Sequence, residues 1–165
     1  MLFELVGYLR RLVMRITGIA IASAAKMPMT EIDLADITKH RGILGNHRGN
    51  WKPGGNNRQI TLLSLHHWES TCAELNAHLP WSARRANICL DTVSLGQHLL
   101  GAKLHLGEQV VLQITGETEP CKRMDEIHPG LQYALRDGWR GGATCKVITG
   151  GTIALDDKVR LEWHA

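Results

Sequence analysis

Cys121 is the residue whose neighbours in the chain most favour chemistry. It follows Pro120 and precedes Lys122 and Arg123, so two cationic side chains come directly after the thiol. Positive neighbours favour the thiolate, which is the form of cysteine that attacks electrophiles and binds soft metals. The alternative is an inert buried cysteine, the commoner state of a free thiol. Local sequence leaves both possibilities open.

The other three cysteines, Cys72, Cys89 and Cys145, are expected in the core. Cys72 falls on the apolar side of a helix pattern, and the other two fall within strand patterns. The four cysteines form no CxxC pair, so their spacing suggests neither a disulfide framework nor a zinc ribbon. Reduced thiols in a cytosol are the simpler interpretation, which predicts a cytoplasmic protein.

Arginine and amide side chains near an apolar stretch are candidates for binding an anionic, heterocyclic ligand. Arg84, Arg85 and Asn87 directly precede that stretch. Arginine forks match phosphate and carboxylate oxygens, and an Asn side chain can pair with the edge of a heterocycle. Arg58, which follows a glycine-rich stretch, has the same potential. For any one of these arginines, the alternative is a solvated surface charge.

The GWRGG run at residues 138–142 is a weaker candidate. Trp139 offers a flat face and Arg140 a charge, while the glycines would let the backbone approach a ligand closely. The same pattern is typical of a helix end followed by a turn. On this basis both interpretations stand.

Several other functions leave no signature in the sequence. The nine histidines include no HExxH, and His66 and His67 are adjacent on a predicted helix, so they point in different directions. GGNNRQ and GWRGG lack the ending and the strand-to-helix setting of a phosphate-binding loop. A net charge of +3 is too small by itself to indicate a nucleic-acid partner, but it suits an anionic small molecule.

Most of the elements expected to position these residues are strands. Alternating or β-branched apolar patterns predict strands at residues 14–22, 31–37, 59–63, 84–90, 109–115, 143–148 and 158–163. Ser64 is expected to cap one helix, a short second helix is expected between Pro129 and Gly138, and residues 41–55 are expected to form a long loop. At 165 residues, with no βαβ rhythm, the chain predicts one mainly β, barrel-like domain with a few short helices.

The N-terminal segment is apolar but is interrupted by Arg10, Arg11 and Arg15. It therefore lacks the roughly 18 to 20 apolar residues that a membrane span needs. We expect residues 1–13 to form an extension and residues 14–165 to form the domain, with no membrane partner.

Six segments with glycine, arginine or proline at set places follow one another along the chain. They are AKMPM (25–29), RGILGNH (41–47), RQITLLS (58–64), RRANICL (84–90) and the runs at residues 100–121 and 138–161. Over residues 14–162 they resemble, in order, the segments of the MOSC family, which is named after the C-terminal part of molybdenum cofactor sulfurases. The matched patterns include its GI-x-GD-x-H loop, its R-x-N-I element and its PC cysteine.

The resemblance implies a small stand-alone MOSC domain of bacterial type, with a barrel-like fold and a molybdenum cofactor (molybdopterin). Cys121 matches the cysteine expected to bind molybdenum or to carry sulfur. Arg58, Arg85 and Asn87 match elements that would hold the phosphate and pterin. With the candidates from local chemistry, the expected cofactor-binding residues are Arg58, Arg84, Arg85, Asn87, Lys122, Trp139 and Arg140.

Two departures from the family pattern limit what it implies. Asn46 stands where the family commonly has Asp, which puts an acid–base role for that loop in doubt. The segments of the desulfurase domain of larger members are absent from this sequence, so we expect no resident pyridoxal phosphate.

The resemblance leaves three functional hypotheses. The first is a molybdenum-dependent oxidoreductase that reduces N-hydroxylated bases or amines with electrons from a separate reductase. The second is a sulfur carrier that receives a persulfide on Cys121 from a cysteine desulfurase and delivers it to a cofactor or metal–sulfur acceptor. The third is a binding domain without catalytic activity.

Overall fold

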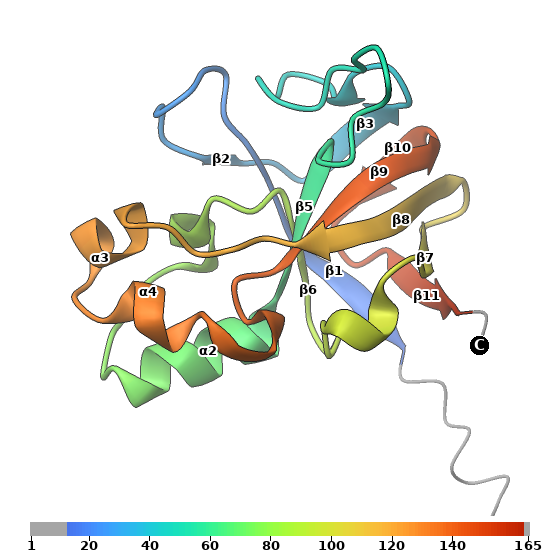
Figure 1. Ribbon diagram of the computed structural model, residues 1–165. Helices are drawn as coiled ribbons and strands as arrows, with labels where there is room; N and C mark the ends of the chain where they lie inside the picture. The colour runs from blue at the N-terminus through green and yellow to red at the C-terminus, as the bar shows by residue number, and fades with distance from the viewer. Residues whose placement is uncertain (1–12, 164–165) are drawn as a thin grey trace, which may run out of the picture.

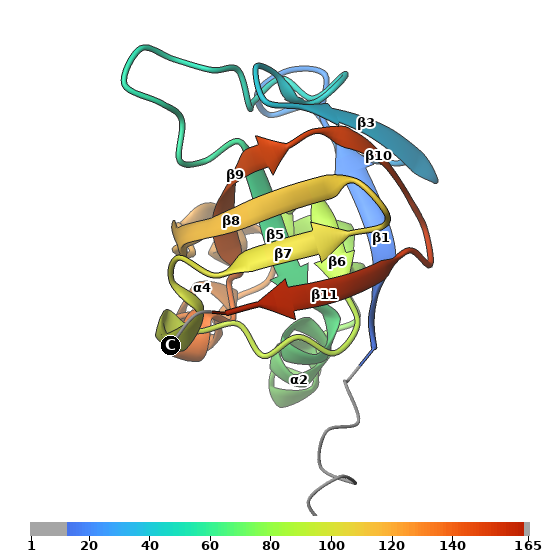
Figure 2. The same cartoon turned by 90° about the vertical axis from the view of Figure 1, so that its right-hand side faces the viewer.

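The computed structural model describes residues 13–163, in which seven strands close into a barrel (Figures 1 and 2). They are β1 (Met14–Ile21), β5 (Ile60–Ser64), β6 (Ile88–Leu90), β7 (Lys103–Leu106), β8 (Val110–Glu117), β9 (Ala143–Thr149) and β11 (Lys158–Glu162). The order is β11-β7-β8-β9-β5-β6-β1, and pairing between β1 and β11 closes the ring. The predicted mainly β, barrel-like fold is confirmed. The predicted N-terminal extension lies, except for Val13, outside the described residues.

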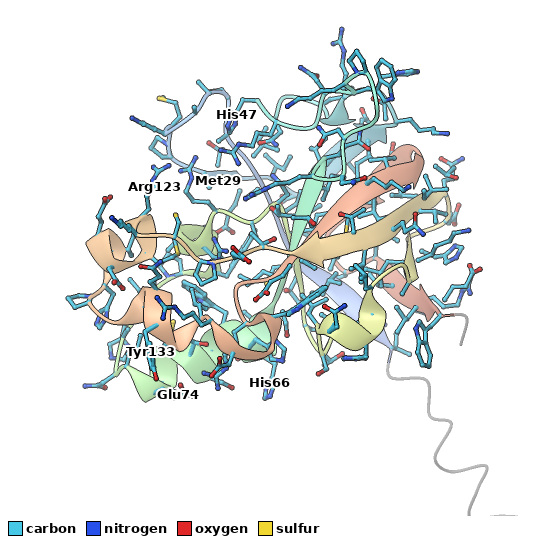
Figure 3. The ribbon with its side chains drawn as sticks, viewed as in Figure 1. Met29, His47, His66, Glu74, Arg123 and Tyr133 are labelled. Carbon is cyan, nitrogen blue, oxygen red and sulfur yellow. The ribbon has the colours of Figure 1, made fainter. Side chains whose placement is uncertain are left out.

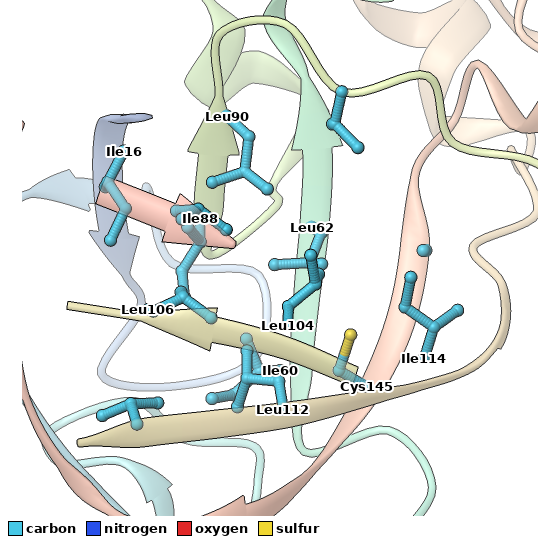
Figure 4. Close-up of a cluster of buried hydrophobic side chains, with 14 of the residues drawn as sticks. Ile16, Ile60, Leu62, Ile88, Leu90, Leu104, Leu106, Leu112, Ile114 and Cys145 are labelled. Atoms are coloured by element: carbon cyan, nitrogen blue, oxygen red, sulfur yellow. The ribbon is translucent and has the colours of Figure 1, made fainter. Parts of the chain in front are cut away.

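The barrel interior is filled by the alternating apolar side chains of its strands (Figure 4). Buried and half-buried positions alternate along β7, where Leu104 and Leu106 are completely buried. This is the pattern of a strand with one face in a core and one face toward solvent. Strand β5 differs, because all of its residues are buried. Its outer face is covered by helices, and Leu63 there packs in a second cluster with Trp68.

Strands β5 and β6 are parallel, whereas the other strand pairs in the described residues are antiparallel. A parallel pair needs a crossover connection, which consists here of helix α2 (Leu65–Glu74) and a 3₁₀ helix at Trp81–Arg84. The Ser64 hydroxyl caps α2 by accepting a hydrogen bond from the backbone N–H of His67 at 3.4 Å, as predicted. The 3₁₀ helix is docked on β1, because the indole of Trp81 occupies the space that a side chain at Gly18 would fill.

Shorter elements extend the barrel at two places. Strand β2 (Thr30–Glu31) pairs with the end of β1, and a separate sheet consists of β10 (Gly151–Ala154), β3 (Leu34–Thr38) and β4 (Gly42–Ile43). Helix α4 (Leu131–Ala134) packs beside α2, and helix α3 (Arg123–Ile127) packs against α4, on one side of the barrel (Figure 1). None of the helices within residues 13–163 has the length and apolar character needed to span a bilayer.

Three predicted elements differ from the observed ones. The strand expected at residues 31–37 is two strands, β2 and β3, and the loop expected at 41–55 begins with β4. Helix α3, directly after Cys121, was not predicted. The strand expected at 84–90 begins only at Ile88, because Arg85 has a left-handed backbone (φ 64°) that ends the 3₁₀ helix.

Candidate functional site: an arginine-lined cavity beside Cys121

A cavity of about 280 Å³ lies between the segment after β1, the loop after β4, the start of β5, the turn before β6 and the segment that follows β8. Figure 3 labels three of its residues, Met29, His47 and Arg123, on different segments around it. The side chains that line it are Met29, Asn46, His47, Arg48, Arg58, Gln59, Thr61, Arg84, Arg85, Ala86, Asn87, Thr118, Glu119, Cys121, Arg123 and Met124. The volume is near the lower end of the range for small-molecule pockets, about 300–1,000 Å³.

Cys121 is the exposed member of the four cysteines, while Cys72, Cys89 and Cys145 are buried. Burial raises the pKa of Cys72, and it raises the pKa of Cys89 to about 11. Burial also raises the pKa of Cys145. The fold therefore separates one accessible thiol in the cavity from three thiols in the core.

Arg84 is the most deeply buried arginine of the cavity, with a relative exposure of 7%. Its Nη2 donates a hydrogen bond to the carbonyl oxygen of Thr118 at 2.9 Å. Burial above all, and then the charge of Arg58, lower its pKa to about 10, while a negative charge at Cys121 acts to raise it. Loss of solvation and the charge of Arg48 lower the pKa of Arg58, and Cys121 again raises it. A negative charge at Cys121 is thus felt by two cavity arginines.

Arg85 and Asn87 also line the cavity, but their side chains are engaged with the protein. Arg85 Nη1 donates a hydrogen bond to the carbonyl oxygen of Met27 at 2.6 Å, which ties the AKMPM segment to the turn before β6. The Asn87 side-chain oxygen accepts hydrogen bonds from the backbone N–H of Thr61 at 3.1 Å and from its hydroxyl at 3.2 Å. The Asn87 amide donates to the carbonyl oxygen of Ala20 at 3.2 Å. Both residues hold the cavity wall together.

Three expected binding residues are not brought to the cavity. Trp139 is 8% exposed and packs in the barrel core. Arg140 forms a two-pronged ion pair with Glu74 of α2, at 2.6 and 2.8 Å, and Glu74 raises its pKa. Lys122 is exposed and is not among the lining residues; Arg123, the next residue, is.

The glycines of the GWRGG run approach protein backbone instead of a ligand. A Cβ atom at Gly142, whose φ is 107°, would overlap the carbonyl oxygen of Leu62. A Cβ at Gly141 would lie 2.6 Å from the carbonyl oxygen of Thr118 and 3.1 Å from Arg84 Nη2. The two glycines therefore let this segment pack closely against β5 and against Thr118 and Arg84 in the cavity wall.

Polar atoms without partners gather at the cavity. Within residues 13–163, four buried side-chain atoms make no hydrogen bond, and three of them belong to lining residues: His47 Nε2, Arg84 Nε and Thr118 Oγ1. His47 Nδ1 lies 3.0 Å from the carbonyl oxygen of Ala22, an acceptor, so the hydrogen of a neutral ring belongs on Nδ1 and Nε2 keeps its lone pair. Buried polar groups are normally satisfied, so such a concentration indicates a place for a polar ligand.

Several of the lining residues were not predicted as site residues. Thr118 carries no local signal, and its importance comes from burial without a partner. Gln59 is 4% exposed; its amide donates to Lys39 and Gly49 and its oxygen accepts from the N–H of Val147, so it anchors the glycine-rich loop to β9. The sequence signal that could have identified Gln59 was its place in the RQ pair of the RQITLLS segment.

Comparison with known proteins decides the family. A sequence profile described as the MOSC domain matches residues 50–160. The chain belongs to the MOSC family. No curated protein sequence matches this MOSC protein significantly.

Solved structures share the fold of this MOSC protein. The YuaD protein of Bacillus subtilis is 19% identical with a TM-score of 0.78, covering 94% of this chain and 99% of that one. YiiM from Geobacillus stearothermophilus is 16% identical with a TM-score of 0.72, covering 91% and 75%. YiiM from Escherichia coli is 15% identical with a TM-score of 0.68, covering 92% and 71%.

Proposed function

We propose that this MOSC protein binds a molybdenum cofactor in the arginine-lined cavity, with Cys121 as a thiolate ligand of the metal. We further propose that it is an oxidoreductase that reduces N-hydroxylated bases or amines with electrons from a separate reductase. The MOSC family is associated with the molybdenum cofactor. The observation that carries the proposal is the single exposed thiol that lines a cavity in which Arg84 Nε and Thr118 Oγ1 are buried without hydrogen-bond partners.

The donor set of the cavity fits a cofactor that joins a phosphate, a pterin and a soft metal. Cationic side chains outnumber the single acidic one, Glu119, and they are Arg48, Arg58, Arg84, Arg85 and Arg123. Guanidinium groups suit phosphate oxygens, and a thiolate suits molybdenum as a soft ligand. Within residues 13–163, no group of three or more His, Cys, Asp or Glu side chains is placed to hold a metal ion.

The division of labour would follow that of other cofactor proteins, in which the bound group supplies the redox chemistry. When bound, the molybdenum centre would exchange electrons with the substrate. The residues of the chain would bind and orient: Cys121 would hold the metal, Arg58 and Arg84 would hold anionic oxygens, and Asn87 would keep β1, β5 and β6 in register around them.

A sulfur-carrier function is the second candidate, and the exposure of Cys121 favours it. A carrier must present its thiol to a sulfur donor and then to an acceptor, which an exposed position in a segment between a strand and a short helix permits. The sulfur donor would be a separate cysteine desulfurase.

Metal analysis and pterin fluorescence on protein made in a cofactor-producing host test the proposal. We expect about one molybdenum per chain, lost in Cys121→Ser and retained in Cys72→Ser, because Cys72 lies outside the cavity. A labile sulfur adduct on Cys121 without molybdenum would favour the carrier. Full molybdenum content in Cys121→Ser would refute Cys121 as the ligand.

A further inference from the structure

Two buried donor side chains, Arg84 and Thr118, lie next to each other at the cavity, and each has one polar atom without a hydrogen-bond partner. Arg84 is 7% exposed and Thr118 is 4% exposed. They are adjacent, because Arg84 Nη2 donates to the carbonyl oxygen of Thr118 at 2.9 Å. Arg84 Nε and Thr118 Oγ1 nevertheless make no hydrogen bond. A buried guanidinium N–H and a buried hydroxyl without hydrogen-bond partners destabilise the ligand-free protein. A ligand that accepts hydrogen bonds from both would offset this cost.

The surrounding chain holds this pair rigidly. The N–H of Thr118 donates to the carbonyl oxygen of Gly142 at 2.9 Å, and Gly141 leaves no room for a side chain against Thr118 and Arg84. Arg84 ends the 3₁₀ helix whose Trp81 is docked on Gly18 of β1. Two separate parts of the chain thus fix the donors before any ligand arrives, which lowers the entropy lost on binding.

The chemistry of the pair selects an anion. Arg84 carries a positive charge that burial disfavours, and an N–H of a guanidinium beside a hydroxyl matches adjacent oxygens of an oxyanion. Arg58, which also lines the cavity and lowers the pKa of Arg84, would share the same negative charge. An anion would relieve the repulsion between these two guanidinium groups.

We propose that Arg84 Nε–H and Thr118 Oγ–H form a buried subsite for a phosphate-type oxyanion in the cavity that Cys121 also lines. The inference rests on the proposed function, because the phosphate of a molybdenum cofactor is one source of that oxyanion. The other source is a small oxyanion that enters independently of the cofactor. Thr118 is then a ligand-binding residue, with a hydroxyl that serves binding at the expense of stability.

Thr118→Val tests the subsite, because it removes the hydroxyl and keeps the shape. Titration calorimetry of the cofactor-free protein with inorganic phosphate should give a dissociation constant about tenfold higher for Thr118→Val, the loss expected for one hydrogen bond to a charged group. The melting temperature without phosphate should stay unchanged or rise, because a buried hydroxyl without a partner is removed.

Thr71→Val is the matched control, since Thr71 is also buried but its hydroxyl donates to the carbonyl oxygen of His67 at 2.8 Å, away from the cavity. It should lower the melting temperature and leave phosphate affinity unchanged. Arg84→Lys, which keeps a charge but loses the fork, should weaken phosphate binding as Thr118→Val does. The subsite is refuted if wild-type protein does not bind phosphate, or if Thr118→Val binds it as tightly as wild type.

Repeating the titration on cofactor-loaded protein separates the two sources. Phosphate binding abolished by the cofactor would assign the subsite to the cofactor's own phosphate, whereas retained, Thr118-dependent binding would assign it to a separate oxyanion. Cofactor content, measured independently, decides the proposed function. Phosphate binding without any cofactor content would therefore leave the subsite standing and overturn the proposed function alone.

Discussion

At the residue scale, the four thiols differ in access, because one is exposed and three are buried. Cys121 is exposed in the cavity, whereas burial raises the pKa of Cys89 to about 11 and also raises that of Cys72 and Cys145. Since the thiolate is the reactive form, the three core cysteines are doubly protected from alkylation.

We therefore expect substoichiometric iodoacetamide near neutral pH to label Cys121 first in cofactor-free protein. Peptide mass spectrometry would locate the label, and the same protein loaded with cofactor should be protected, because a coordinated thiolate has its lone pair engaged. Dominant labelling of Cys72, or equal labelling of all four cysteines, would contradict the assignment.

Asn87 gives a second residue-scale prediction. Asn87→Ala leaves the buried N–H of Thr61 and the carbonyl oxygen of Ala20 without their side-chain partner. Each such loss costs about 1–3 kcal/mol, so we expect a clear drop in the free energy of unfolding, measured by urea denaturation. Asn57→Ala, at an exposed position outside the cavity, is the control and should change stability little. If Asn87→Ala were as stable as wild type, the structural role of Asn87 would be contradicted, and ligand binding alone would remain as its function.

At the element scale, helix α2 carries a group whose protonation opposes folding. Burial, followed by the charges of His66 and Arg140, lowers the pKa of His67 below its usual 6.5, and its Nδ1 has no partner. The unfolded chain then binds more protons than the folded chain near that pH. Stability from this group is present above the unfolded pKa and is lost as the pH falls through about 6.5 toward the folded pKa.

His67→Gln should accordingly flatten the decline in the free energy of unfolding as the pH falls from neutral to about 5. His78→Gln, at an exposed histidine just after the helix, should leave the decline as in wild type. Urea denaturation at a series of pH values measures both. Parallel pH profiles for wild type and His67→Gln would show that this histidine is not the cause.

Local sequence predicted those elements whose own residues determine them. Ser64 and the apolar spacing after it were sufficient for α2, and alternation was sufficient for strands such as β9 and β11, whereas β7 was not predicted. The strand expected to include Arg84 and Arg85 fails there because the left-handed backbone of Arg85 ends a 3₁₀ helix, and this geometry depends on the docking of Trp81 against distant β1.

The candidate site was predictable in part for the same reason. Arg58, Arg84, Arg85, Asn87 and Cys121 do line one cavity. Trp139 and Arg140 of the GWRGG run do not line it. Trp139 packs in the barrel core, and Arg140 forms an ion pair with Glu74. Thr118 could not be selected from sequence, because an unpartnered buried atom is a property of tertiary packing alone. His47 did have a signal, because it is the histidine of the RGILGNH segment that resembles the family's loop.

At the scale of the whole molecule, stability depends on the barrel interior. Leu104 is completely buried there, so Leu104→Ala should lower the free energy of unfolding by about 2–5 kcal/mol. Leu100, which is 48% exposed, is the control, and its replacement by alanine should change stability by no more than about 0.5 kcal/mol. Equal effects of the two substitutions in urea denaturation would contradict the core assignment.

The pairing of β1 with β11 joins the two ends of the described chain, with Met14 opposite Val159. Contacts so distant in sequence form slowly, because the whole intervening chain must be ordered before they are made. Until β11 is in place, β1 and β7 both present open hydrogen-bonding edges. Such edges recruit other chains. The refolding protein should therefore aggregate most readily before β11 has paired, and its soluble yield on refolding should fall as the protein concentration rises.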